Sequence, residues 1–150
     1  MKMNYKNMKK SELIALVQEL TTPKYRVTGS YNIGKKLIED IGCLNQEHFM
    51  LVVLDNNNEI LEEKILNIGN VNSSIVDLAE FARTILRHST GVNFITAHNH
   101  PSGSLIPSNE DDQIRNKILK IAELFKFNYL DDMIITRNEY WSAKEAEIIK

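Results

Sequence analysis

The segment 92–125 constrains the fold most, because it reads as a strand, a fixed loop and a helix in direct succession. The short apolar run VNFITA predicts a buried strand that delivers His98 and His100 at its end. The prolines, glycine and serines of PSGSLIPS then predict a loop that folds the chain back. A helix is expected over 109–125, where the apolar residues recur at helical spacing: Ile114, Ile118, Ile121, Ala122 and Phe125. This order predicts a sheet with helices packed on it.

The flanking sequence adds further strands and one more helix. EHFMLVVLD, an Asn-rich turn at 56–58 and EILEEKILNIG together predict a β-hairpin. Ser74 and Asp77, spaced as in a capping box, predict the start of a helix that continues to about Leu86. The run YLDDMIITRNEYWSA predicts one more strand, a tight turn and a short arm. We therefore expect an α/β or mixed α+β fold with a mixed sheet in three layers.

The first 45 residues differ from the rest. Ser11 is expected to cap a helix with one apolar face, formed by Leu13, Ile14, Leu16, Val17 and Leu20. Pro23 and Gly29 interrupt the pattern, and a second short helix is expected over 33–41. About 45 residues are few for an independent core. We interpret 1–45 as a helical lead-in that is not a domain of its own, and 46–150 as the domain.

Charge is unevenly distributed, although the net charge is only −2. Residues 1–36 carry eight Lys or Arg and two Glu, a charge of +6, so the other 114 residues sum to −8. A basic end can contact nucleic-acid phosphates, but a solvated helix face is the commoner reason for such a run. No apolar run approaches the roughly 20 residues that span a bilayer, and we expect a cytoplasmic chain with no membrane contact. The lone Cys43 excludes an internal disulfide and a cysteine-rich zinc site.

Three residues point to a metal ion. His98 and His100 are two apart on an extended strand end, so both rings point the same way. The loop can return Asp111 to them, and two His with one carboxylate, leaving a position for water, form the ligand set of hydrolytic zinc sites. Simpler interpretations exist, since paired His often only cap a strand. Likewise, Ser108 and Asp111 are spaced to cap a helix.

The whole string is more specific than its parts. HNHPSG followed by PSxxD resembles the JAMM signature in the form that the RadC family carries. The resemblance extends over about 46–144, through the EHF strand, GNVNSS, LDDMIIT and YWS. Two places depart from that family's pattern, which has Pro-Arg where this chain has Asp77-Leu78 and Asp-His where it has Asp131-Asp132. No match to the helix-hairpin-helix segment of full-length RadC proteins is found in the sequence.

The resemblance implies a three-layer JAB/MPN-like fold, with a mixed, curved β-sheet flanked by helices, and one Zn²⁺ per chain held by His98, His100 and Asp111. It implies that Glu47 is the general base, with Glu59 and Glu62 on the paired strand as the alternatives. It also implies that Ser108 helps to stabilise the oxyanion. Other zinc chemistries fit less well, since neither the deaminase pattern nor HExxH is present. A binuclear site would need further His, and we expect His48 to point away and His88 to serve a helix dipole.

Three functions remain open on the sequence. The first is a zinc-dependent hydrolase of an amide or isopeptide bond, acting on a protein or peptide substrate. The second is an accessory protein of DNA repair or other nucleic-acid work, although no reading motif for DNA or RNA is present. The third is an inactive interaction module, but such MPN scaffolds generally lose the ligands that this chain keeps. Fold alone does not decide among them.

Overall fold

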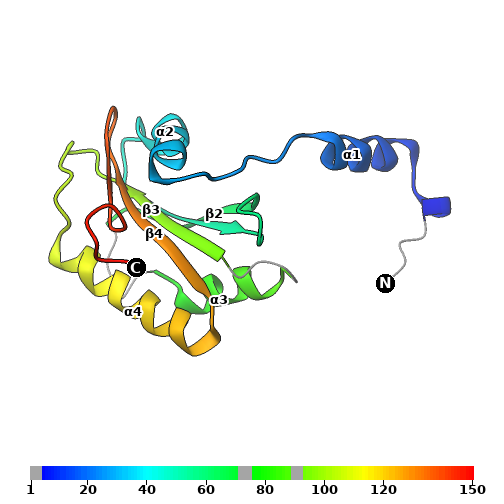
Figure 1. Ribbon diagram of the computed structural model, residues 1–150. Helices are drawn as coiled ribbons and strands as arrows, with labels where there is room; N and C mark the ends of the chain where they lie inside the picture. The colour runs from blue at the N-terminus through cyan, green and yellow to red at the C-terminus, as the bar shows by residue number, and fades with distance from the viewer. Residues whose placement is uncertain (1–4, 71–75, 89–92) are drawn as a thin grey trace.

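The computed structural model describes residues 5–70, 76–88 and 93–150, and its elements follow the expected order (Figure 1). A short 3-10 turn, Tyr5–Asn7, comes first. The helices span Lys10–Thr21 (α1), Ser30–Ile41 (α2), Leu78–Leu86 (α3) and Asn109–Phe125 (α4). The strands span His48–Leu54 (β1), Ile60–Ile68 (β2), Asn93–Asn99 (β3), Asn128–Ile135 (β4) and Tyr140–Ser142 (β5).

The strands form one mixed sheet in the order β2-β1-β3-β4-β5. β1 pairs antiparallel with β2 and with β3, β3 pairs parallel with β4, and β4 pairs antiparallel with β5. Parallel neighbours cannot be joined by a tight turn and need a crossover, which α4 supplies. The loop 100–108 therefore connects the carboxyl end of β3, where the two His residues lie, to the first turn of α4.

The β1–β2 hairpin is confirmed, and its turn is held by one carboxylate. The side chain of Asp55 accepts hydrogen bonds from the backbone N–H groups of Asn57 at 2.8 Å and Glu59 at 2.9 Å. Asn58 adopts the left-handed region at φ 61°, which Asn tolerates better than most residues. The side-chain hydrogen bonds of Asp55 and the left-handed conformation of Asn58 thus explain why the chain turns at these residues.

The sheet lies between two helical layers, which confirms the three-layer mixed α+β fold. Figure 1 shows α2 on one face of the sheet and α3 and α4 on the other. The core under α2 includes Ile33, Leu37, Ile41, Val52, Ile95 and Met133. The core under α3 and α4 includes Phe49, Leu51, Phe81, Phe94, Ile114 and Ile118. Alternate residues of β1 and β3 face opposite layers, as a pleated strand requires.

α1 packs differently from α2. No residue of α1 is buried, and Figure 1 shows the helix beyond an extended segment, away from the sheet. The expected cap at Ser11 is wrong: α1 begins at Lys10, and the backbone N–H of Lys9 donates to the Glu12 carboxylate at 2.7 Å. Within the described ranges, no helix has both the length and the apolar character needed to cross a bilayer.

α3 begins after Asp77, whose side chain accepts the backbone N–H of Glu80 at 2.9 Å. A carboxylate at this position is a good N-cap. Ser74, the other half of the expected capping box, lies outside the described residues. The first departure from the RadC pattern, at Asp77-Leu78, therefore coincides with a helix start.

The end of α2 packs tightly against the turn between β4 and β5. A Cβ added at Gly42 would lie 2.6 Å from the backbone carbonyl oxygen of Thr136. We expect Gly42→Ala to lower the free energy of unfolding by about 1–3 kcal/mol, because backbone must move to admit the methyl group. Urea denaturation measures this. Gly29→Ser is the control, since a Cβ at Gly29 meets nothing within 4 Å; equal losses in both variants would contradict this packing.

Candidate metal centre

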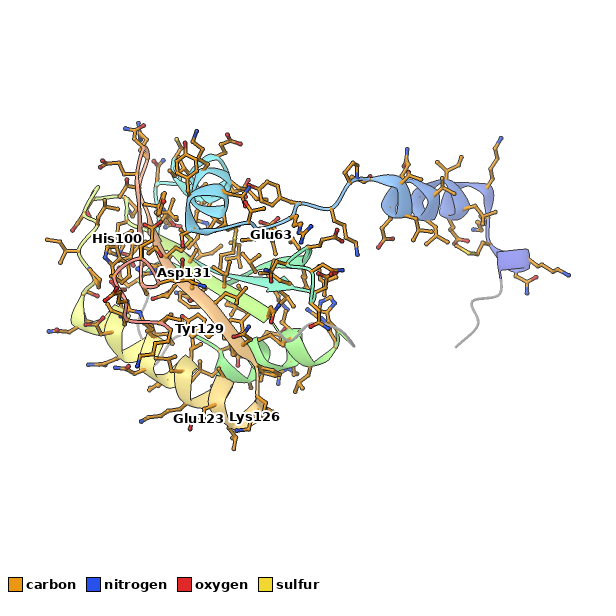
Figure 2. The ribbon with its side chains drawn as sticks, viewed as in Figure 1. Glu63, His100, Glu123, Lys126, Tyr129 and Asp131 are labelled. Atoms are coloured by element: carbon orange, nitrogen blue, oxygen red, sulfur yellow. The ribbon has the colours of Figure 1, made fainter. Side chains whose placement is uncertain are left out.

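β3 positions two imidazole rings at one end of the sheet. His98 is the last but one residue of β3, and His100 follows the strand directly. Because side chains alternate along an extended chain, the two rings share a face, and their Nε2 atoms lie 2.9 Å apart. His98 is buried, with a relative exposure of 1%, whereas His100 lies at the start of the exposed β3–α4 loop (Figure 2).

The loop after His100 brings a carboxylate to the same point. Asp111 lies in the first turn of α4, and its Oδ1 is 3.1 Å from Nε2 of His98. Its Oδ2 is 3.4 Å from Nε2 of His100. The structure therefore brings His98, His100 and Asp111 together, as the sequence predicted.

Asp111 also takes part in the cap of α4. Its backbone N–H donates to Oγ of Ser108 at 3.1 Å, and its Oδ2 accepts the backbone N–H of Ser108 at 2.8 Å. The simpler interpretation of these residues as a capping box is thus correct. It does not compete with the metal interpretation, because the reciprocal bond orients the carboxylate toward the two rings.

The arrangement fits a small divalent cation. Four ligands at about 2.0–2.1 Å in a tetrahedron stand about 3.3 Å from one another. The two Nε2 atoms lie 2.9 Å apart, and they lie 3.1 and 3.4 Å from Oδ1 and Oδ2 of Asp111 respectively, so the three separations are close to that spacing. Within the described ranges this is the one group of three or more potential ligands that converges, all its ligand atoms lying within 4.8 Å of each other.

Nδ1 of His100, the ring nitrogen that points away from the cluster, has the hydrogen bond that usually orients a metal-binding imidazole. Nδ1 of His100 lies 2.7 Å from the backbone carbonyl oxygen of Ser104, to which it donates. This bond fixes the ring and directs the lone pair of Nε2 into the cluster. Nδ1 of His98 is buried and has no protein hydrogen-bond partner in the described structure, while Phe49 stacks beside that ring with centroids 6.3 Å apart.

The electrostatics of the cluster favour positive charge. Hydrogen bonding to Asp111 raises the pKa of the His100 ring, with burial opposing it. Burial alone would raise the pKa of Asp111, but hydrogen bonds from His100 and His98 outweigh it and hold that pKa well below its usual range. A buried carboxylate that stays ionised among imidazoles is a suitable ligand for a dication.

An open, mainly polar cavity of about 490 Å³ lies over the cluster. Glu47 and Ser108, the expected general base and oxyanion residue, both line it with two of the three cluster residues. The other lining residues are Asn70, Ser102, Ser104, Ile106 and Glu110. Glu47 immediately precedes β1, and its backbone carbonyl accepts the N–H of Gly69 at 2.8 Å.

The alternatives for the base lie elsewhere. The register pairs Phe49 with His98, whereas Glu62 pairs with Val53 at the other end of β1. Glu62 binds Nε2 of His88 at 2.6 Å and Nη2 of Arg87 at 2.7 Å. His88 follows the C-terminal end of α3, as expected, and its ring pairs in addition with Glu62. Glu59 stands beside the hairpin turn, and neither glutamate lines the cavity over the cluster.

Sequence reasoning missed Asn99, which is fully buried between the two His residues. Its amide N–H groups donate to the backbone carbonyls of Leu44 at 3.2 Å and Gln46 at 3.0 Å. Its Oδ1 accepts the backbone N–H of His48 at 2.7 Å. These bonds hold the chain on both sides of Glu47 against the end of β3. A polar residue inside a buried strand must find partners, and that requirement was the available signal.

In the absence of a metal ion, His100 and Asp111 should make stability depend on pH. The lowered pKa of Asp111 gives a contribution that is present above its usual pKa and is lost as the pH falls. The raised pKa of His100 gives a contribution that is full below its usual 6.5 and is lost as the pH rises through the raised value. We expect the difference in unfolding free energy between wild type and His100→Gln, in chelator, to peak between about pH 4 and 6.5. Urea titrations at several pH values measure it, and a constant difference would contradict the pairing.

Comparisons with known proteins agree with this architecture. Residues 27–148 match the family model of the RadC-like JAB domain. A UPF0758 protein of Alkaliphilus oremlandii is 34% identical over 149 residues, covering 94% of this chain and 63% of that protein. The UPF0758 protein YsxA of Bacillus subtilis is 33% identical over 135 residues, covering 89% and 58% respectively.

A UPF0758 protein of Clostridioides difficile is 33% identical over 138 residues, covering 92% of this chain and 58% of that protein. The chain thus spans about three-fifths of the length of these relatives. The family match includes α2, the whole sheet and the cluster of His98, His100 and Asp111. On this match and these identities, the chain belongs to the RadC-like JAB domain family.

Proposed function

We propose that this domain is a zinc-dependent hydrolase of the JAMM type, which cleaves an amide or isopeptide bond in a protein or peptide substrate. One observation carries the proposal. Three potential ligands converge, and two of them, His100 and Asp111, line an open cavity together with Glu47 and Ser108. Structural zinc sites are closed by four protein ligands, whereas catalytic sites keep one position for water or substrate.

His98, His100 and Asp111 would hold the ion, and the fixed orientation of His100 by the Ser104 carbonyl supports that role. When bound, Zn²⁺ polarises a carbonyl and lowers the pKa of a water molecule to about 7. The imidazole rings must be neutral to bind it, so affinity should increase as the pH rises above the pKa of His100.

Glu47 would accept the proton of the attacking water and pass it to the leaving amine nitrogen, so that OH adds to the carbonyl carbon and H to the nitrogen. Its place in the cavity wall supports this assignment. Asn99 restrains the backbone on both sides of Glu47, which limits the positions that its carboxylate can take.

Ser108 would donate a hydrogen bond to the oxyanion that develops on the carbonyl oxygen. Its oxygen already accepts the backbone N–H of Asp111, and that bond does not use the hydroxyl proton. The proton is therefore available to a group in the cavity that Ser108 lines. The Ser108 side chain can therefore cap α4 through its oxygen and stabilise the oxyanion through its proton at the same time.

The protein should purify with close to one zinc ion per chain, or take up one on reconstitution. We expect His100→Ala to lose it, because two remaining ligands bind weakly. His88→Ala is the matched control, since its ring binds Glu62 at the other end of the sheet. Elemental analysis that finds no zinc in wild type, before or after reconstitution, would refute the site.

Glu47→Gln should retain zinc and lose hydrolysis by about 10²–10⁴-fold, because an amide cannot accept the water proton. The assay uses a panel of peptides and isopeptide-linked substrates, with single- and double-stranded DNA as the competing class. Glu59→Gln is the control, because Glu59 does not line the cavity over the cluster. Loss of zinc in Glu47→Gln would instead make Glu47 a ligand, and cleavage of DNA alone would favour the nucleic-acid function.

A further inference from the structure

Arg115 is a charged side chain inside the domain, with a relative exposure of 3%. It lies on α4 four residues after Asp111, so the two share one face of the helix and stand one turn apart. That face is the one that packs on the sheet, together with Ile114 and Ile118. A buried guanidinium needs specific partners, because an unpaired charge is very unfavourable there.

Two carboxylates and one aromatic ring surround Arg115. Its Nε donates to Oδ2 of Asp132 on β4 at 2.7 Å, and its Nη1 donates to Oδ1 of Asp112 at 2.6 Å. The guanidinium carbon lies 5.2 Å from the centre of the Trp141 ring on β5. Asp112 is exposed, but Asp132 is as deeply buried as Arg115, with a relative exposure of 2%. The Arg115–Asp132 pair is therefore a buried ion pair that links α4 to the sheet.

The link continues from Asp132 to β3. The hydroxyl of Thr96 donates to Oδ1 of Asp132 at 2.7 Å. With its proton used there, Thr96 can only accept from the hydroxyl of Tyr129, which lies against it. Thr96 precedes His98 by two residues, so both side chains point to the α4 face.

We call the hydrogen-bonded chain Arg115–Asp132–Thr96 the bridge. It connects α4 to β3 about one helical turn away from the cluster of His98, His100 and Asp111. At one end it holds α4 one turn beyond Asp111, and at the other it holds β3 two residues before His98. The residues 101–106 between β3 and α4 are mainly exposed. The distance between Asp111 and His98 must then be set by the buried face of α4, where the bridge lies.

Stability alone does not account for the pair. Replacing a buried ion pair by apolar side chains is often neutral or stabilising. Here Nη2 of Arg115 is also buried without a protein hydrogen-bond partner in the described part of the chain. What an ion pair with directed hydrogen bonds provides, and an apolar contact does not, is a defined separation between helix and strand.

We propose that Arg115 and Asp132 are positioning residues of the metal centre, which fix Asp111 relative to His98 and His100. The inference rests on the proposed function, because it concerns the affinity of the same three ligands for a metal ion. Asp132 is also the position at which this chain departs from the Asp-His of the RadC pattern. In this fold that departure is one half of the bridge.

The chain offers a matched control on the same strand. Asp131 is equally buried, at 2%, but its side chain points to the α2 face (Figure 2). Its Oδ2 accepts the hydroxyls of Ser30 at 2.8 Å and Ser142 at 2.6 Å, and its Oδ1 accepts backbone N–H groups. One of these N–H groups is the backbone N–H of Asp132, at 2.8 Å. Asp131→Asn thus disturbs a buried carboxylate next to Asp132 but leaves the side-chain hydrogen bonds of the bridge in place.

The test measures metal binding rather than turnover. Wild type (residues 1–150), Asp132→Asn, Asp131→Asn and the double variant Arg115→Met/Asp132→Leu are titrated with Zn²⁺ against a chromophoric chelator. The same proteins are titrated with Co²⁺, whose visible d–d spectrum reports ligand geometry. Urea denaturation of each metal-free protein measures stability separately.

We expect Asp132→Asn and the double variant to bind Zn²⁺ about 10–100-fold more weakly than wild type, the range seen for partners that orient ligands. Their Co²⁺ spectra should shift or lose intensity. Asp131→Asn should lose stability but keep the zinc Kd within about twofold and the Co²⁺ spectrum unchanged. The double variant leaves no unpaired buried charge, because Asp112, which loses its Arg115 partner, is exposed to solvent, so the variant should fold even where Asp132→Asn does not.

Unchanged affinity and spectra in both bridge variants would overturn the inference and leave the proposed function intact. An equal loss of affinity in Asp131→Asn would also overturn it, because the effect would then follow stability. So would failure of both bridge variants to fold, since the pair would then serve the fold itself. A wild type that binds neither Zn²⁺ nor Co²⁺ would refute the proposed function instead.

Discussion

The parallel pairing of β3 with β4 is the constraint on which the candidate site depends. Parallel neighbours require a crossover, and α4 makes it over the face of the sheet that carries Phe94 and His98. The first turn of the crossover helix must start near the carboxyl end of β3. The two imidazoles end that strand and the carboxylate begins that helix, so sheet topology brings His98, His100 and Asp111 together across a loop of exposed residues.

Buried charged groups occur on both faces of the sheet, and each has its own hydrogen-bond partners. On the α4 face, the imidazole–carboxylate cluster lies at the strand ends, and the Arg115–Asp132 pair lies one helical turn further along. On the α2 face, the Asp131 carboxylate accepts hydroxyl and backbone donors, and burial still raises its pKa. Each of these buried carboxylates has a different set of partners. Asp111 borders the cavity of about 490 Å³ together with His100, whereas Asp131 borders a smaller one of about 130 Å³ on the α2 face, where hydroxyl and backbone donors already occupy its oxygens.

Membership of the RadC-like JAB domain family establishes the fold, and the chemistry rests on the residues of the cavity. One fold supports many functions, and the ligands and the base are what distinguish a hydrolase from a scaffold. Here two of the three potential ligands, the carboxylate-bearing Glu47 and the hydroxyl-bearing Ser108 line one cavity of about 490 Å³. The basic residues of 1–36 are divided among the first ten residues, the segment after α1, and α2, and none of those that the structure describes lines this cavity.

The sequence by itself determined what depends on neighbours along the chain. Strand alternation put His98 and His100 on one face, helical spacing gave α4, and the turn residues gave the β1–β2 hairpin. Local reasoning failed where several neighbouring residues could cap a helix. Ser11 was expected to cap α1, but the helix begins at Lys10 and Glu12 accepts the backbone N–H of Lys9. Local reasoning placed His88 at a helix end but did not show that the ring also binds Glu62 on β2.

Only the tertiary structure decided which distant residues meet. The register of β1 against β3 puts Glu47, and not Glu59 or Glu62, beside the cluster. Asn99 binding across 53 positions to Gln46, and Arg115 reaching Asp132, have no periodic signature in the sequence. Such contacts depend on strand order and helix placement, and a shift of one residue in register would turn every side chain of a strand to the other face.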